Sequence, residues 1–130
     1  RRLIAVRTRG ERCRIMKAVK VIVAIAAIAF AVFVVYHFQQ RRQLAQWNNQ
    51  ATQLIGQERY DEALPLLEKA RAKDASNHVI WKNLGTVYDG LGRPKEALEA
   101  YQRSLGINPQ QPEVQRRVEE LRKELKAAGA

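Results

Sequence analysis

The chain has 130 residues, 46% of them hydrophobic, and a formal net charge of +10. That length provides one modest domain and an appendage. Residues 1–20 hold eight cations and one anion, whereas residues 39–130 hold fifteen cations and twelve anions. A nucleic-acid-binding domain carries its excess cations on the folded part. The charge distribution therefore argues against nucleic acid as a partner and assigns the basic start to a membrane surface.

The first predicted elements are a basic tail at residues 1–17 and a transmembrane helix at residues 18–38. The stretch from Val21 to Gln40 carries no formal charge and is mostly aliphatic. A helix over residues 18–38 would be about 31 Å long at about 1.5 Å per residue, which matches a hydrocarbon core. Only a helix satisfies its own backbone hydrogen bonds in lipid. Within it, Ala27 and Ala31 form a small-xxx-small pair that permits close packing against another membrane helix.

Two other interpretations of the apolar stretch are weaker. A cleavable signal peptide needs small residues after its apolar core, but the residues from Val34 to Phe38 are bulky, which favours an uncleaved anchor. A buried helix of a soluble protein would need a larger surrounding domain than this chain supplies. Because the cations precede the stretch, we expect the N-terminus in the cytoplasm. We therefore predict a bacterial inner membrane protein, with its folded domain in the periplasm.

The start of the chain leaves two alternatives open. Met16 would be a natural first residue for a signal anchor, and a start there would remove the Arg-rich tail and weaken the charge bias. Residues 1–15 are also Arg-rich and nearly free of acids, as organellar presequences are, so an organellar inner membrane is the alternative location. Cys13 is the single cysteine and cannot form an intrachain disulfide.

A juxtamembrane connector at residues 39–46 lacks Pro and Gly and is predicted to be helical. Beyond it, the chain repeats itself at an offset of 34 residues: Trp47 pairs with Trp81, and the Glu-Ala-Leu at residues 62–64 recurs at residues 96–98. A 34-residue period of two helical segments resembles the tetratricopeptide repeat family. The second unit carries the family pattern at Trp81, Leu84, Gly85, Tyr88, Ala97, Tyr101, Ser104 and Pro109. The first unit matches it less well.

The resemblance implies an all-α fold in which the transmembrane helix precedes two tetratricopeptide-like hairpins at residues 47–111. A capping helix and tail follow at residues 112–130, where Val114, Val118, Leu121 and Leu125 recur at helical spacing. Pro65 is expected to kink the second helix of the first hairpin. Because repeat proteins need about three units for a continuous core, two units and a cap indicate stabilisation by a partner, by self-association or by the membrane tether.

In this family the first helix of each hairpin lines a groove that receives a peptide or a helix. The resemblance assigns the partner-binding groove to Asn48, Asn49, Thr52, Lys82, Asn83, Thr86 and Arg117. Amides and hydroxyls suit an extended backbone or a polar chain terminus, although the same residues would also serve as a wet surface without a ligand. A subgroup of the family clamps chaperone C-termini with cations. Of its five clamp positions only Asn83 and Arg117 match, and Glu113 carries the wrong charge, which argues against that ligand.

Catalysis has little support in the sequence. His37 and His78 are 41 residues apart, and the sequence shows neither a metal-ligand spacing nor a glycine-rich phosphate loop. We therefore predict no enzyme activity, no cofactor and no metal. The predicted function is a membrane-anchored scaffold for protein–protein interaction, as an accessory subunit of a larger membrane complex. The alternative is a transient assembly factor or chaperone outside the cytoplasm, acting on cytochromes, pili or secretion components.

Overall fold

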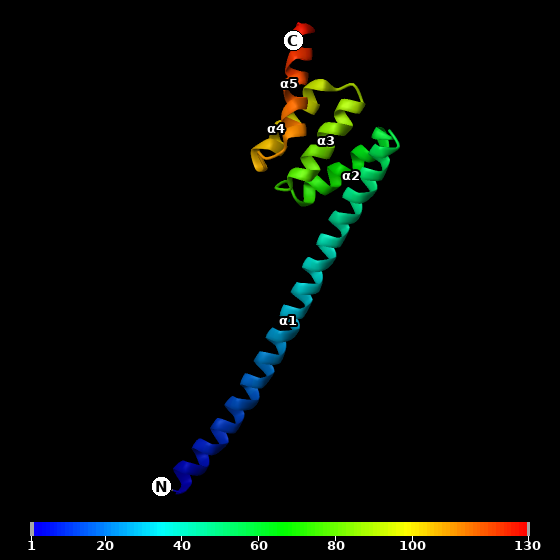
Figure 1. Ribbon diagram of the computed structural model, residues 1–130. Helices are drawn as coiled ribbons and strands as arrows, with labels where there is room; N and C mark the ends of the chain where they lie inside the picture. The colour runs from blue at the N-terminus through cyan, green and yellow to red at the C-terminus, as the bar shows by residue number, and fades with distance from the viewer. Residues whose placement is uncertain (1, 130) are drawn as a thin grey trace. The chain divides into compact units, whose positions relative to one another are not determined.

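The computed structural model describes residues 2–129, with side chains described from residue 8 onward. The described residues form five α-helices and no strand (Figure 1). The helices are α1 (Arg2–Gly56), α2 (Tyr60–Lys73), α3 (His78–Gly90), α4 (Pro94–Ile107) and α5 (Pro112–Ala127). The chain divides into two compact units, one up to Arg41 and one from Arg42. Because the described residues form helices and no strand, the predicted all-α fold is confirmed for them.

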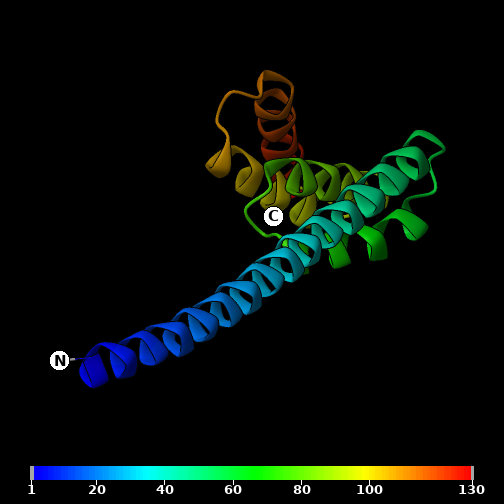
Figure 2. The same ribbon diagram turned by 90° about the horizontal axis from the view of Figure 1, so that it is seen from below.

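The first unit consists of the N-terminal part of α1 (Figure 2). Its apolar residues are exposed, including Ile22 at 64% and Phe30 at 69%. An 18-residue window within α1 reaches a mean hydropathy of 2.8, and none of that window is buried in the structure. Length and composition therefore suffice for this helix to cross a membrane.

The boundaries predicted at residues 17/18, 38/39 and 46/47 coincide with no helix end, because α1 runs through all three. The segment predicted as a basic tail is helical from Arg2 onward. It contains no proline, and its arginines are good helix formers. The side chains of residues 1–7, with three of the tail's cations, lie outside the described residues, as does the last residue of the predicted C-terminal tail.

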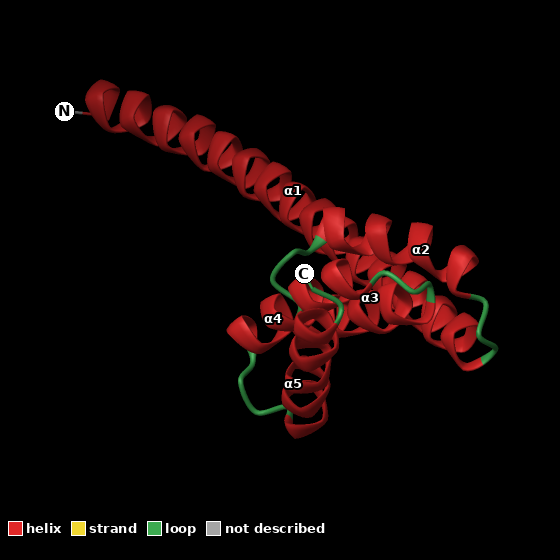
Figure 3. Ribbon diagram, turned by 90° about the horizontal axis from the view of Figure 1, so that it is seen from above, coloured by secondary structure: helices red, strands yellow, loops and turns green. Residues whose placement is uncertain are grey.

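The second unit contains the end of α1 and helices α2 to α5. Helix α3 packs against both α2 and α4, and α4 packs against α5 (Figure 3). The end of α1 joins the same core through Ala51. The first hydrophobic cluster combines α1 to α4 and contains Ala51, Ala63, Leu67, Ala70, Ile80, Trp81, Leu84, Val87 and Ala100. The second cluster joins α4 to α5 and contains Ala97, Tyr101, Val114, Val118 and Leu121.

Two glycines allow aromatic rings to reach the backbone of α3. A Cβ atom on Gly85 would lie 2.5 Å from Cδ1 of Tyr101, which is closer than carbon atoms can approach. Gly90 is contacted in the same way by the ring of Tyr60. Both rings come from second helices of hairpins, Tyr60 from α2 and Tyr101 from α4. Gly85 therefore lies where α3 and α4 pack closely, and a larger residue there would collide with the Tyr101 ring.

The helix ends follow from local chemistry. Asn77 caps α3, since its Oδ1 accepts a hydrogen bond of 3.0 Å from the backbone N–H of Val79. Pro94 and Pro112 occupy the first positions of α4 and α5, where a missing N–H loses no helical bond. Gly92 adopts a positive φ of 70° in the turn before α4, a conformation that favours glycine. Pro65 lies inside α2, which continues past it to Lys73.

Candidate protein-binding surface

The predicted groove residues come from three helices of the second unit. Helix α1 supplies Asn48, Asn49 and Thr52, helix α3 supplies Lys82, Asn83 and Thr86, and helix α5 supplies Arg117. Their exposure differs: Asn49 and Thr52 are exposed, whereas Asn83 is buried. Side-chain contacts divide these residues into a hydrogen-bonded group, a charged cluster and a remainder that faces solvent.

The hydrogen-bonded group connects α1 to α3. The Asn83 amide N–H donates to Oδ1 of Asn48 at 2.9 Å and to Oγ1 of Thr52 at 3.5 Å. Thr52 in turn donates to the backbone carbonyl of Asn48 at 2.9 Å. With Asn83 only 9% exposed, this bond fixes the first helix of one hairpin against the first helix of the next. The sequence alone assigned these amides either to a ligand or to a wet surface, and not to a contact between helices.

Thr86 is engaged in a similar way. It donates to the backbone carbonyl of Lys82 at 3.2 Å and accepts a bond of 3.2 Å from the hydroxyl of Tyr101. Burial raises the pKa of Tyr101, because the phenolate would be poorly solvated there. Thr86 therefore satisfies a buried phenol, while Lys82 beside it is half-exposed.

Arg117 is neutralised by carboxylates. Its guanidinium makes two bonds to Asp89, from Nε to Oδ2 at 2.6 Å and from Nη2 to Oδ1 at 2.8 Å. Nη1 reaches Glu120 and Glu124, each at 3.0 Å. These bonds, foremost the one to Asp89, raise the pKa of Arg117 above its ordinary value. Three carboxylates surround one cation, so this end of the groove is unsuited to a carboxylate ligand.

Sequence reasoning missed these acidic partners of Arg117. Glu120 and Glu124 stand three and seven residues after it on α5, and that spacing was the available signal. Asp89 is 28 residues away on α3, and no sequence pattern indicated it. The bidentate pair docks α5 onto the end of α3 and strengthens the capping contact made by the second hydrophobic cluster.

Two cation–π contacts to Trp81 on α3 were also missed. The guanidinium Cζ atoms of Arg71 on α2 and Arg103 on α4 lie 5.5 and 5.0 Å from the centroid of the Trp81 ring. The Trp81 indole N–H donates to the carbonyl of Ala75 at 2.7 Å. The hydrogen bond satisfies the indole N–H, and Trp81, which is 8% exposed, belongs to the first hydrophobic cluster.

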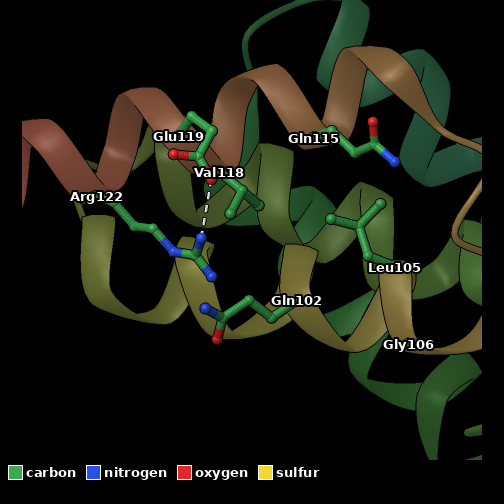
Figure 4. Close-up of a pocket in the computed structure, with 7 residues that line it drawn as sticks. All are labelled: Gln102, Leu105, Gly106, Gln115, Val118, Glu119 and Arg122. Carbon is green, nitrogen blue, oxygen red and sulfur yellow. Dashed lines mark hydrogen bonds and ion pairs between the residues drawn. The ribbon is translucent and has the colours of Figure 1, made fainter.

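A hollow in the second unit lies between α4 and α5 and has a volume of about 580 Å³ (Figure 4). Leu105 and Val118 provide its apolar floor. An ion pair of 2.9 Å between Glu119 and Arg122 runs along its α5 side. The remaining lining residues are Gln102, Gly106 and Gln115. This hollow is open and lined by both polar and apolar groups, and the sequence did not predict it.

The remaining site predictions concern catalysis and the predicted membrane helix. Among the described residues, no three His, Cys, Asp or Glu side chains converge in a way that could hold a metal ion. Ala27 and Ala31 are both exposed on α1, and their role in helix packing stays a prediction.

Comparison with known proteins identifies the family of the second unit. A family model described as tetratricopeptide repeat matches residues 54–121. The solved structure of MamA MSR-1 is 25% identical with a TM-score of 0.59, and the match covers 64% of this chain and 48% of that one. The structure of a MamA mutant is 25% identical with a TM-score of 0.59, and the match covers 64% of this chain and 61% of that one. The structure of MamA AMB-1 is 28% identical with a TM-score of 0.55, and the match covers 58% of this chain and 45% of that one.

The chain thus spans about half the length of the MamA chains that it resembles. A search of curated proteins found no match. The matched family segment covers more than half of the sequence, and its stacked helical hairpins are the fold described above. Such hairpins form scaffolds for protein–protein interaction. The chain belongs to the tetratricopeptide repeat family.

Proposed function

We propose that the protein is a membrane-anchored scaffold and serves as an accessory subunit of a larger membrane complex. Its hairpins would hold the extramembrane part of a partner, and the apolar half of α1 would cross the bilayer. The observation that carries this proposal is the long exposed apolar surface of α1. Ile22, Phe30 and Val32 are each more than 60% exposed, and soluble monomers rarely leave apolar patches of such extent uncovered.

The flanking charges support one orientation. Eight cations precede the apolar stretch in sequence, and Arg41 and Arg42 follow it closely. Under the positive-inside rule the N-terminus stays in the cytoplasm and the repeats lie on the other side. A bacterial inner membrane with the repeats in the periplasm fits this charge distribution, and an organellar inner membrane is the alternative.

Within the groove, the groups left for a partner are specific. Asn49 is exposed, Lys82 is half-exposed, and neither side chain hydrogen-bonds to another group among the described residues. The Asn48–Asn83 bond also leaves both N–H groups of the Asn48 amide and Oδ1 of Asn83 for an outside ligand. A donor and an acceptor side by side match the C=O and N–H of an extended peptide. We assign the partner contact to these groups rather than to Arg117.

The anchor is tested by placing charges in the apolar stretch. Ile25→Arg with Ile28→Arg should release the protein from membranes washed with alkaline carbonate, since each arginine costs about 2.5–3.5 kcal/mol at the centre of a spanning helix. The matched control is Gln102→Arg, an exposed position on α4, which should stay in the pellet with the natural protein. Release of the natural protein by the same wash would refute the anchor.

The scaffold role is tested by copurification in mild detergent from the native membrane. A subunit should appear one-to-one with a mature complex, and Lys82→Ala should weaken retention of the partner. Lys69→Ala removes the same charge from the exposed surface of α2 and should leave retention unchanged. Copurification with precursors alone would instead support the transient assembly factor. A protein that is purified alone as a stable monomer would contradict both roles.

A further inference from the structure

The solvent side of α1 beside the repeats carries a row of glutamines. Gln43, Gln46, Gln50 and Gln53 are spaced by three, four and three residues, and all four are exposed. We call them the glutamine stripe. They belong to residues 43–57, a run without any Asp, Glu, Lys or Arg, and this is the longest such run outside the apolar stretch. Spacing of three and four places the four side chains along one side of the helix.

One side of the same helix segment packs against the repeat core. Leu44, Trp47 and Leu54 pack against the first hydrophobic cluster, and Asn48 is bonded to Asn83. By contrast, the stripe amides form no side-chain hydrogen bond to any described residue. The stripe is thus separate from both the core and the predicted groove.

The two end helices of the repeat unit differ in a way that solubility does not explain. Helix α5 has nine charged residues among its sixteen, as expected of a cap whose outer side faces water. The part of α1 from Gln43 to Gly56 has none. A capping role alone would be served by charges on both helices. The uncharged side of α1 therefore points to contact with another protein surface.

We propose that the glutamine stripe pairs with the same stripe of a second copy, in parallel and in register. A carboxamide is both donor and acceptor, so a row of them is complementary to itself, as a two-fold interface requires. Two copies of a chain with a charge of +10 repel each other, and the stripe is a surface where no like charges would meet. Spacing of three and four residues is also the seam of two-stranded helix pairing.

Two further features fit this pairing. In the sequence the same alternation continues upstream through Gln39, Tyr36 and Val32. Beside the stripe, a hollow of about 310 Å³ between α1 and α2 is lined by Gln50, Gln53, Leu54, Gln57, Arg59 and Leu66, which offers space for side chains of the second helix. Polar seam residues fix register at a cost in stability, so the pair is weak. The parallel sense rests on the proposed anchor, which inserts both copies in the same direction and concentrates them.

Cysteine crosslinking in membranes tests the pair. In the full chain with Cys13→Ser, Gln46→Cys and Gln53→Cys are oxidised separately, with Ala45→Cys as the control, since Ala45 is exposed on α1 but off the stripe. Disulfides need Cβ atoms about 3.5–4.5 Å apart, so both stripe variants should give dimers of this chain and Ala45→Cys should give few. Equal yields at all three positions, no dimers at the stripe, or crosslinks only to a different protein would each overturn the proposal.

A charge variant provides a second readout. Gln46→Glu with Gln53→Glu keeps side-chain shape and places like charges opposite each other, which should weaken dimerisation in detergent by about tenfold or more. Ala45→Glu adds the same type of charge off the stripe and should leave dimerisation unchanged. Tryptophan fluorescence should show both variants folded. Unchanged dimerisation of the Gln46→Glu, Gln53→Glu variant would refute the pair, whereas carbonate extraction judges the anchor independently.

Discussion

Gly85 offers the sharpest test of the hairpin packing. A Cβ added there would lie 2.5 Å from Cδ1, 2.6 Å from Cε1 and 2.8 Å from Cγ of Tyr101. The ring cannot yield freely, because Tyr101 is only 6% exposed and its hydroxyl is bonded to Thr86. Overpacking of this kind costs about 1–3 kcal/mol, while alanine gains about 1 kcal/mol in helix propensity. Gly85→Ala should therefore destabilise the repeats by about 1–2 kcal/mol, because the ring's restraint favours the upper half of the overpacking range.

Gly106 provides the matched control. It lies within α4, and a Cβ there would have no atom within 4 Å. Gly106→Ala should stabilise by about 0.5–1 kcal/mol through propensity alone. Urea unfolding monitored by tryptophan fluorescence measures both, since Trp47 and Trp81 both report on the repeat unit. Destabilisation of the Gly85→Ala variant should be relieved by Tyr101→Leu in the same chain. If Gly85→Ala proves as stable as Gly106→Ala, the close contact between α3 and α4 is wrong.

Three further predictions concern the same unit. Burial raises the folded-state pKa of Tyr101 and of Tyr88, so stability is complete below the unfolded pKa near 10 and falls as pH rises beyond it, by at most about 1.4 kcal/mol per pH unit for each tyrosine. In alkaline urea titrations Tyr101→Phe should flatten that slope, and an unchanged slope would contradict the assignment. Arg117→Lys cannot keep both bonds to Asp89 and should lower the unfolding free energy by about 1–2 kcal/mol, which calorimetry would detect as a lower melting temperature. Trp81→Phe loses its indole hydrogen bond and should lose about 1 kcal/mol in the same experiment, and full stability would contradict that bond.

The hairpins could be predicted because their information is local and repeated. The period of 34 residues brings Trp81, Gly85 and Tyr101 to fixed positions, and each of these lies in the core or at a helix contact in the structure. Pro94 and Pro112 marked helix starts, since proline at the first helical position sacrifices no hydrogen bond. The boundary inside α1 between the apolar segment and the first repeat helix could not be located in this way. A long helix built of good helix formers carries no internal signal for where a membrane segment ends and a repeat begins.

The groove was predicted less well, because its state depends on contacts between residues far apart in sequence. Asn48 and Asn83 are 35 residues apart, and Arg117 is 28 residues from Asp89. Family resemblance identified the positions but not whether their side chains are already satisfied. From the sequence alone, an arginine on a groove helix is interpreted as a free cation, because its neighbours in space are not known. Here three carboxylates surround Arg117, so this end of the groove is acidic.

The Asn48–Asn83 bond also changes how a partner could use the groove. A ligand that displaced it would have to replace the lost bond, which is worth about 1 kcal/mol, and would leave a nearly buried amide to be satisfied again. A ligand that kept it would find two carboxamides already fixed in orientation, so less side-chain entropy would be lost on binding. The second route therefore costs less free energy, both in hydrogen bonding and in side-chain entropy. The hydrogen bond that aligns the first two groove helices therefore also prepares their amides for an extended peptide, and structural and binding roles coincide in the same residues.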